Sequence, residues 1–156
     1  MSYTKNKIPV YEIRRTDERK PYLHKLDEIN MLDEDMKYID NVVEKLEEYY
    51  DVSHLLEERI YVVSCDRRMR ILGITEASKG SESNSIIPYK EIVMFALLTG
   101  AHQIMLFHNH PSGELSASEE DDLASQRLSV ALTMVEIEFP IHAIIADGDY
   151  NIFWEE

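Results

Sequence analysis

The sequence has few of the residues that build disulfides or thiolate-rich metal sites. Cys65 is the only cysteine among 156 residues, which excludes an internal disulfide and a four-thiolate metal site. Zinc deaminases are excluded as well, because their Pro-Cys-x-x-Cys motif needs two cysteines. The sequence also lacks a His-Glu-x-x-His motif, the commonest helical zinc-protease site. A metal site here needs histidine and carboxylate ligands, and we expect Cys65 to be a small buried residue in a strand.

Long apolar segments are absent too. The longest uninterrupted apolar run, Ile92 to Leu98, has seven residues, whereas a membrane-spanning helix needs about 20. Residues 1–15 lack the apolar core of a signal peptide. We therefore expect a cytoplasmic protein with no membrane segment, and the length and the 44% hydrophobic content indicate one ordinary globular domain.

Basic residues are outnumbered. The chain has 16 Lys and Arg against 30 Asp and Glu, a formal net charge of -14. Such a charge repels phosphate backbones and weighs against a nucleic-acid partner. The charge is uneven, since residues 1–20 carry six basic and three acidic side chains, whereas residues 33–58 carry two and ten. A local basic contact with DNA therefore stays open as an alternative.

Apolar periodicity divides the chain into two parts. Residues 1–32 are polar and mixed, and we interpret them as an N-terminal arm or irregular lead-in with a short strand at residues 8–13. From residue 33 to residue 50, apolar side chains recur at steps of three and four, which predicts an amphipathic helix. We expect the folded domain to span residues 33–156.

Strands and helices then alternate. A Pro-start, Gly-stop pattern predicts a helix from Pro88 to Gly100, and an Asp-Gly turn at residues 147–148 predicts a closing hairpin. The remaining expected elements are a hairpin of residues 59–65 and 69–75, a Ser/Gly-rich surface loop at 76–85, and strands at 103–107, 141–146 and 149–154. A helix is expected at 118–135, and its apolar face comprises Leu123, Leu128, Ala131, Leu132 and Val135. This order indicates an α/β sandwich.

The segment His108-Asn109-His110 carries the clearest chemical signal. Alternate strand residues point to the same side, so the two imidazoles converge if the strand continues through Asn109. Asp121 follows in the first turn of the next helix and can supply an oxygen ligand. Two histidines, one aspartate and a water are the ligand set of an open, catalytic zinc site.

Simpler explanations exist for the same residues. Ser118-x-x-Asp121 at a helix start also predicts a capping box that needs no metal, and both roles can coexist. His142 lies on an apolar strand, where a hydrogen-bonded core histidine is commoner than a ligand. We expect Asn109 and the following Pro-Ser-Gly to shape the loop.

The motif H-N-H-P-S-G with Ser118 and Asp121 resembles the JAMM signature of JAB/MPN metallopeptidases, specifically the RadC-type branch. The segments EERIYVVSCD, SNSIIPYKEIVMFALLTGAHQIMLFHNHPSG and HAIIADGDYNIFWE also resemble RadC segments in order, so the similarity covers about residues 55–156. It implies a single-domain JAB/MPN-like α/β fold, a mixed β-sheet flanked by helices. It also implies a zinc ion held by His108, His110 and Asp121.

The resemblance further implies two catalytic residues. Glu58 occupies the position of the general base, which takes a proton from water and passes it to the leaving amine, and Glu57 is the adjacent competitor. Ser118 would stabilise the oxyanion. The chain departs from the family in having Ile141-His142 where an Asp-His pair is common, and it shows no counterpart of the helix-hairpin-helix segment of longer RadC proteins, which weakens a role in DNA repair.

Two functions follow as hypotheses. The first is a zinc-dependent hydrolase of peptide or isopeptide bonds, a JAMM-type metallopeptidase acting on an unidentified peptide or protein. The alternative is a non-catalytic or DNA-associated JAB-type binding module with a structural zinc. The sequence predicts neither the substrate nor the oligomeric state.

Overall fold

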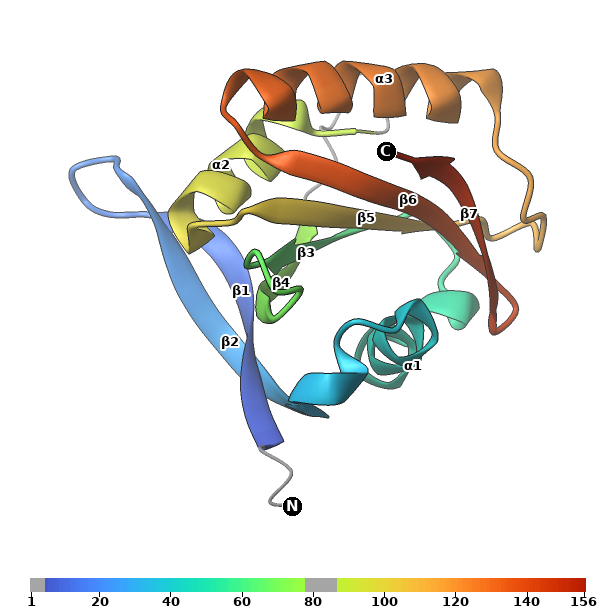
Figure 1. The fold of residues 1–156 in the computed structure, drawn as a ribbon, viewed down its shortest axis with the longest axis horizontal. Helices are drawn as coiled ribbons and strands as arrows, with labels where there is room; N and C mark the ends of the chain where they lie inside the picture. The colour runs from blue at the N-terminus through green and yellow to red at the C-terminus, as the bar shows by residue number, and fades with distance from the viewer. Residues whose placement is uncertain (1–4, 78–86) are drawn as a thin grey trace.

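The computed structural model describes residues 5–77 and 87–156 (Figure 1). In these residues, seven strands form one mixed sheet in the order β2-β1-β4-β3-β5-β6-β7. The strands are β1 (Lys5–Arg15), β2 (Pro21–Leu32), β3 (Ile60–Cys65), β4 (Ile71–Ala77), β5 (Gln103–Asn109), β6 (Glu138–Ala146) and β7 (Asp149–Glu155). The α-helices are α1 (Ile39–Tyr50), α2 (Tyr89–Thr99) and α3 (Glu119–Met134), and short 3₁₀ turns η1 (Asp33–Asp35) and η2 (Val52–His54) flank α1.

The central strands β3 and β5 are buried on both faces. Every residue of each strand is buried, as expected for near-continuous apolar runs in the middle of a covered sheet. Alternate residues divide between two cores: Tyr61 and Val63 pack on the α1 side, whereas Ile60 and Val62 pack on the side of α2 and α3. The alternation thus determines which side chains at the ends of these strands face α3.

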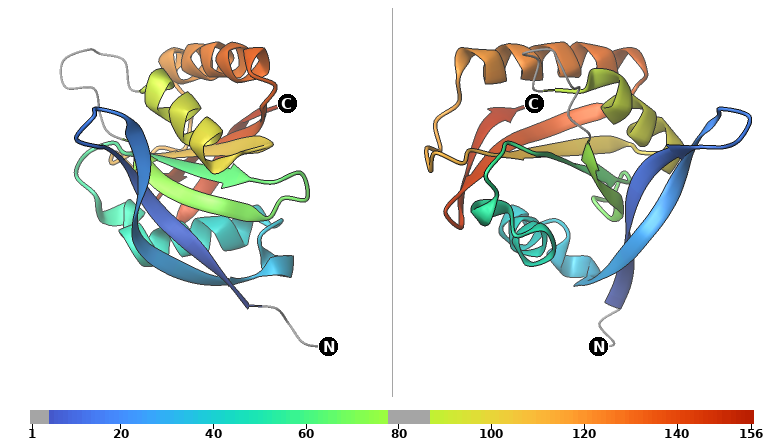
Figure 2. Two further views of the ribbon diagram at one scale, coloured as in Figure 1. Left: turned by 90° about the vertical axis from the view of Figure 1, so that its left-hand side faces the viewer. Right: turned by 180° about the vertical axis from the view of Figure 1, so that it is seen from behind.

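Helices cover both faces of the sheet, α2 and α3 on one and α1 on the other (Figures 1 and 2). This confirms the predicted α/β sandwich. The predicted amphipathic helix is confirmed for residues 39–50. On α3 the predicted apolar face is correct for Leu128 and Leu132, which are fully buried, and wrong for Leu123 and Val135, which are 47% and 37% exposed. Leu123 instead borders a surface pocket described below, and Val135 follows the last helical turn.

The expected short strand at residues 8–13 lies within β1, but the expectation of an irregular lead-in is wrong for residues 21–32, which form β2. Strands β1 and β2 form a long antiparallel hairpin, and β1 also pairs in parallel with β4 through Val10 and Ile74. Apolar residues of the hairpin, Ile8, Val10, Ile29 and Met31, enter the α1-side core. The sequence of β2 lacks a clear strand pattern because β2 is an edge strand. Charged side chains at exposed positions of such a strand protect against aggregation. A domain boundary at residue 33 stays a prediction.

Both predicted hairpins are present, with β3 and β4 antiparallel and β6 and β7 joined at Asp147-Gly148. Asp147 and Gly148 have φ of 49° and 76°, the positive values that a tight hairpin turn requires. Of the expected loop at 76–85, residues 76 and 77 belong to β4 and the rest lies outside the described residues. No helix in the described ranges is long and apolar enough to cross a membrane.

The Cys65 thiol should be inert in the native protein. Its side chain is 0% exposed, as the sequence predicted, and burial raises the pKa of the thiol to about 12, which leaves almost no thiolate at neutral pH. We expect a disulfide reagent such as DTNB to label one thiol per chain in denaturant and none in buffer. Equal labelling rates in the two conditions would contradict this packing.

Candidate metal centre

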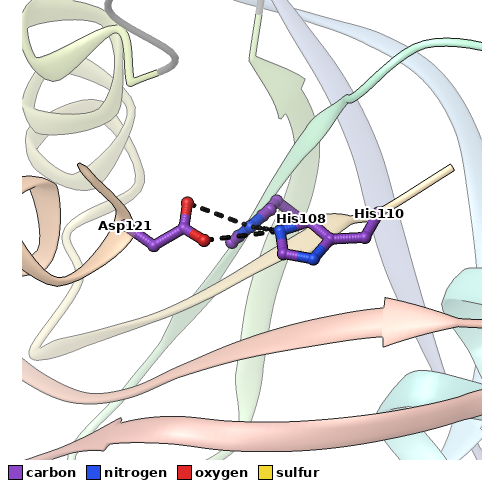
Figure 3. A group of neighbouring side chains, drawn as sticks. All are labelled: His108, His110 and Asp121. Carbon is purple, nitrogen blue, oxygen red and sulfur yellow. Dashed lines mark hydrogen bonds and ion pairs between the residues drawn. The ribbon is translucent and has the colours of Figure 1, made fainter. Parts of the chain in front are cut away.

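The end of β5 and the start of α3 bring together the three predicted ligands. His108 lies within β5 on the face toward α3. The His110 N–H donates to the Ile145 carbonyl at 3.1 Å, which extends the pairing with β6 beyond the last residue of β5. His108 and His110 therefore keep the two-residue alternation and share a face. Asp121, the third residue of α3, lies opposite them (Figure 3).

The three side chains converge on one point. The Nε2 atoms of His108 and His110 are 2.9 Å apart. Each Nε2 also lies 3.4 Å from one Asp121 carboxylate oxygen, His108 from Oδ1 and His110 from Oδ2. His108 and Asp121 are buried, and the His110 side chain is only 12% exposed. The predicted set is thus assembled in a mostly buried site.

A capping box orients the aspartate. The Asp121 N–H donates to Ser118 Oγ at 3.1 Å, and the Ser118 N–H donates to Asp121 Oδ2 at 2.9 Å. The cap that the sequence offered as an alternative is therefore present, and the same carboxylate also faces both imidazoles. A cap of this kind contributes about 1 kcal/mol to helix stability.

The Asp121 carboxyl is held in its charged form. Burial alone would raise its pKa, but the hydrogen bond and charge that His108 supplies when protonated, together with the hydrogen bonds from Ser118, outweigh burial and hold the pKa of Asp121 well below its ordinary value of 3.8. Asp121 therefore offers a full negative charge at every pH near neutrality.

The hydrogen bond behind His110 determines which ring nitrogen carries the proton. Its Nδ1 lies 2.8 Å from the Glu114 carbonyl oxygen. A carbonyl only accepts, so Nδ1 must donate. In the neutral ring, Nε2 then presents its lone pair toward His108.

A longer chain of hydrogen bonds determines the same tautomer for His108. The Ser125 hydroxyl donates its single proton to the Asp121 carbonyl at 2.9 Å, so Ser125 Oγ must accept from His142 Nδ1, 2.7 Å away. Burial holds the pKa of His142 well below 6.5, which keeps that ring neutral. His142 Nε2 therefore accepts from His108 Nδ1 at 2.7 Å, and in the neutral His108 ring Nε2 is left with a lone pair.

Two lone pairs and a carboxylate thus face one another. Such groups repel unless a cation or a shared proton lies among them. In a tetrahedral site with metal–nitrogen bonds near 2.0 Å, ligand atoms lie about 3.3 Å apart, close to the separations of 2.9 and 3.4 Å between the donor atoms here. The residues are therefore compatible with a metal site.

Glu58 lies just before β3, and its backbone is close to the site. Ile60 is paired with His108 in the antiparallel ladder, so continuing this register by two residues sets Glu58 opposite His110. No hydrogen bond or ion pair among the described residues joins its half-buried side chain to the three ligands. Glu57, the competitor, is exposed and forms an ion pair with Arg59 at 3.5 Å.

A pocket of about 240 Å³ opens beside the three ligands. Its walls are mainly apolar, and its charged residues outside the ligand set are Glu120 and Arg127 of α3. The lining comprises Ile60, Ile87, Tyr89, His108, Glu120, Asp121, Leu123, Ala124, Arg127 and His142. A bound molecule in this pocket would contact His108 and Asp121 directly.

Comparison with known proteins agrees with this geometry. The family model described as "RadC-like JAB domain" matches residues 36–156. The chain belongs to the RadC-like JAB domain family. This confirms the resemblance drawn from the motif, and residues 1–35, which include the β1–β2 hairpin, lie outside the match.

The similar curated proteins carry no named activity. UPF0758 proteins of Nitrosococcus oceani and Desulfitobacterium hafniense are 35% and 36% identical over 109 and 108 residues, or 68% and 64% of this chain. A UPF0758 protein of Symbiobacterium thermophilum is 30% identical over 104 residues, 67% of this chain. The matches cover 49%, 48% and 44% of those proteins, so the chain spans about half the length of the curated relatives it matches.

Sequence patterns missed the residues that support the ligands. His142 is the buried, hydrogen-bonded core histidine that was expected, but its bond to His108 joins residues 34 positions apart. It arises because β6 pairs in parallel with β5, with His142 beside Leu106. The available signal was a histidine within the apolar run of β6, and Ser125 offered none.

Removing one ligand should empty the centre. We expect the parent protein to hold about one zinc per chain and His108→Ala to hold almost none, as measured by elemental analysis after purification and exposure to zinc. His54→Ala is the matched control, since His54 lies far outside the ligand set with a 78% exposed side chain. Equal zinc content in His108→Ala and the parent would refute the site.

Breaking the hydrogen-bond chain behind His108 should weaken the site without removing a ligand. We expect His142→Phe, and to a smaller extent Ser125→Ala, to weaken zinc binding by about 10- to 100-fold, because the His108 ring loses the partner that fixes its tautomer. Competition with a chromophoric chelator gives the affinity. Ser129→Ala, which removes another buried hydroxyl of α3, should bind zinc like the parent; equal losses in all three variants would point to general destabilisation.

Proposed function

We propose that this chain is a zinc-dependent hydrolase of peptide or isopeptide bonds, a JAMM-type metallopeptidase. The observation that carries the proposal is the convergence of two imidazole lone pairs and a charged carboxylate beside an open pocket. His108, His110 and Asp121 would hold the ion. Three protein ligands leave one position open, as catalytic zinc sites do, whereas structural sites are closed by four.

The donor set favours zinc over the harder cations. Magnesium and calcium prefer oxygen ligands, and two of the three donors here are imidazoles. When bound, zinc would lower the pKa of a water in its open position to about 7 and polarise a carbonyl group.

Glu58 is the proposed general base. Its carboxylate would accept a proton from the attacking water and later deliver it to the leaving amine. Two observations support Glu58 over Glu57: Glu58 lies two residues before Ile60, the ladder partner of His108, and Glu57 is engaged with Arg59.

Ser118 is the proposed oxyanion donor. Within the capping box its oxygen accepts the Asp121 N–H, which leaves the hydroxyl proton available for another acceptor. That proton would donate to the oxygen of the scissile carbonyl as negative charge develops there.

The partner we propose is a peptide or protein in the cytoplasm. The apolar walls of the pocket suit part of a peptide chain, and the net charge of -14 disfavours a nucleic-acid backbone. The chain offers Arg127 as a positive group beside the site.

Replacing the base should separate hydrolysis from metal binding. With a pool of tryptic and lysine-isopeptide-linked peptides read by mass spectrometry, we expect Glu58→Gln to slow cleavage by about 10²- to 10⁴-fold, with zinc content equal to that of the parent. Glu57→Gln is the control and should cleave at the parent rate.

Two results would overturn the proposal. If Glu58→Gln cleaves at the parent rate, Glu58 is not the general base. If the zinc-loaded parent cleaves no peptide in the pool, the binding module with a structural zinc is favoured. Tight, strongly salt-dependent binding to duplex DNA would support the DNA-associated form of that alternative.

A further inference from the structure

We propose that Asn109 is a positioning residue that holds Glu58 at the metal centre by extending the ladder between β3 and β5 with its side chain. The inference rests on the proposed role of Glu58 as the base. The observations that carry it are the hydrogen bonds of the Asn109 carboxamide and the orientation of the side chains on either side of Glu58.

The regular ladder ends before Glu58. Paired residues run from Cys65 and Gln103 to Ile60 and His108, and β3 begins at Ile60. Residues 57–59 therefore approach the centre without strand pairing of their own, although they immediately precede the residue opposite His108.

Asn109 spans this gap with two hydrogen bonds. Its Oδ1 accepts the Arg59 N–H at 2.6 Å, and its Nδ2 donates to the Glu57 carbonyl at 3.0 Å. A strand residue likewise offers a neighbouring strand one N–H donor and one carbonyl acceptor. The carboxamide thus replaces a backbone partner, and its two bonds bracket Glu58 on both sides.

Asparagine is the residue type that can make this pair. Asn109 is 2% exposed, so both polar atoms need partners, and they have them. Aspartate has no donor for the Glu57 carbonyl, and leucine, of similar shape, has neither a donor nor an acceptor.

The neighbouring ion pairs show which way Glu58 points. Arg59 pairs with Glu76 at 3.2 Å, and Glu76 lies beside Tyr61 in the ladder of β3 and β4, on the α1 side of the sheet. Glu57 also pairs with Arg59, at 3.5 Å, so the side chains of residues 57 and 59 share that side, and we infer that the residue between them faces the opposite side. That is the α3 side, where His108, His110 and Asp121 converge.

Asn109 also lies between the two histidines in sequence. One three-residue segment therefore carries both imidazole ligands and the side chain that holds the base. The same short backbone segment, residues 108–110, therefore positions both the proposed base and the two imidazole ligands. Precise proton transfer needs this kind of rigid support.

The test is Asn109→Leu in the full chain, with two measurements that need no substrate. Amide hydrogen exchange at Arg59 should become about tenfold faster, since one hydrogen bond of ordinary strength is lost, while exchange within β3 stays unchanged. With glutamate carboxyls labelled with ¹³C and Co²⁺ bound, paramagnetic broadening of the Glu58 signal, assigned with Glu58→Gln, should decrease.

Activity supplies the third measurement. In the peptide assay, Asn109→Leu should lower kcat by about 10- to 100-fold with KM and metal content unchanged, and should add little further loss to Glu58→Gln. Asn151→Leu is the matched control, because it removes another asparagine-to-backbone bond, from Asn151 to the Leu115 carbonyl, and should behave as the parent in all three measurements.

The outcomes separate this inference from the proposed function. Unchanged Arg59 exchange, unchanged Glu58 broadening, or fully additive losses with Glu58→Gln would overturn the role of Asn109. If Asn109→Leu changes exchange and broadening as expected while the parent cleaves no peptide, Asn109 does position Glu58 and it is the hydrolase proposal that fails.

Discussion

Mutual repulsion among two imidazole nitrogens and one carboxylate is the constraint on which this site depends. Their closest atoms lie 2.9 and 3.4 Å apart in a mostly buried position. Hydrogen bonds behind the rings keep their protons on the far nitrogens, so the facing nitrogens present lone pairs. Burial makes such repulsion stronger than it is in water, and a divalent cation among the three groups converts it into attraction.

Different forces hold each donor group in place. Burial on both faces determines the position of β5 and thus of His108, the capping box holds the start of α3 and thus Asp121, and the Glu114 carbonyl orients His110. In our proposal, the β3 ladder, continued by Asn109, carries Glu58 toward the same point. The supports thus come from β5, from the start of α3 and from one carbonyl of the segment that joins them.

The parts of the site that were predicted from sequence depend on local rules. Strand residues two positions apart point to the same face of the sheet, and Ser-x-x-Asp at the start of a helix forms a cap. These two rules group His108, His110 and Asp121 from the sequence alone. Glu58 came from family resemblance instead, since no short-range rule connects residue 58 with residue 108. The central strands and the hairpins were predictable for the same local reason, because their apolar and turn residues alternate or cluster along the chain.

The missed features depend on long-range pairing. Strand β2 is held by its ladder with β1, and its charged exposed residues hide the strand pattern. His142 and Ser125 meet His108 only because β6 and α3 pack beside β5, and Asn109 was interpreted as a loop residue because its backbone partners are 50 and 52 residues away. Side-chain patterns along one segment hold no information about such partners.

X-ray absorption at the zinc edge tests the central claim most directly. For the zinc-loaded protein we predict a first shell of nitrogen and oxygen near ~2.0 Å, with the multiple-scattering signature of two imidazoles and no sulfur, falling to one imidazole in His110→Ala. A sulfur ligand, or an imidazole count that is the same in both proteins, would contradict a centre built from His108, His110 and Asp121.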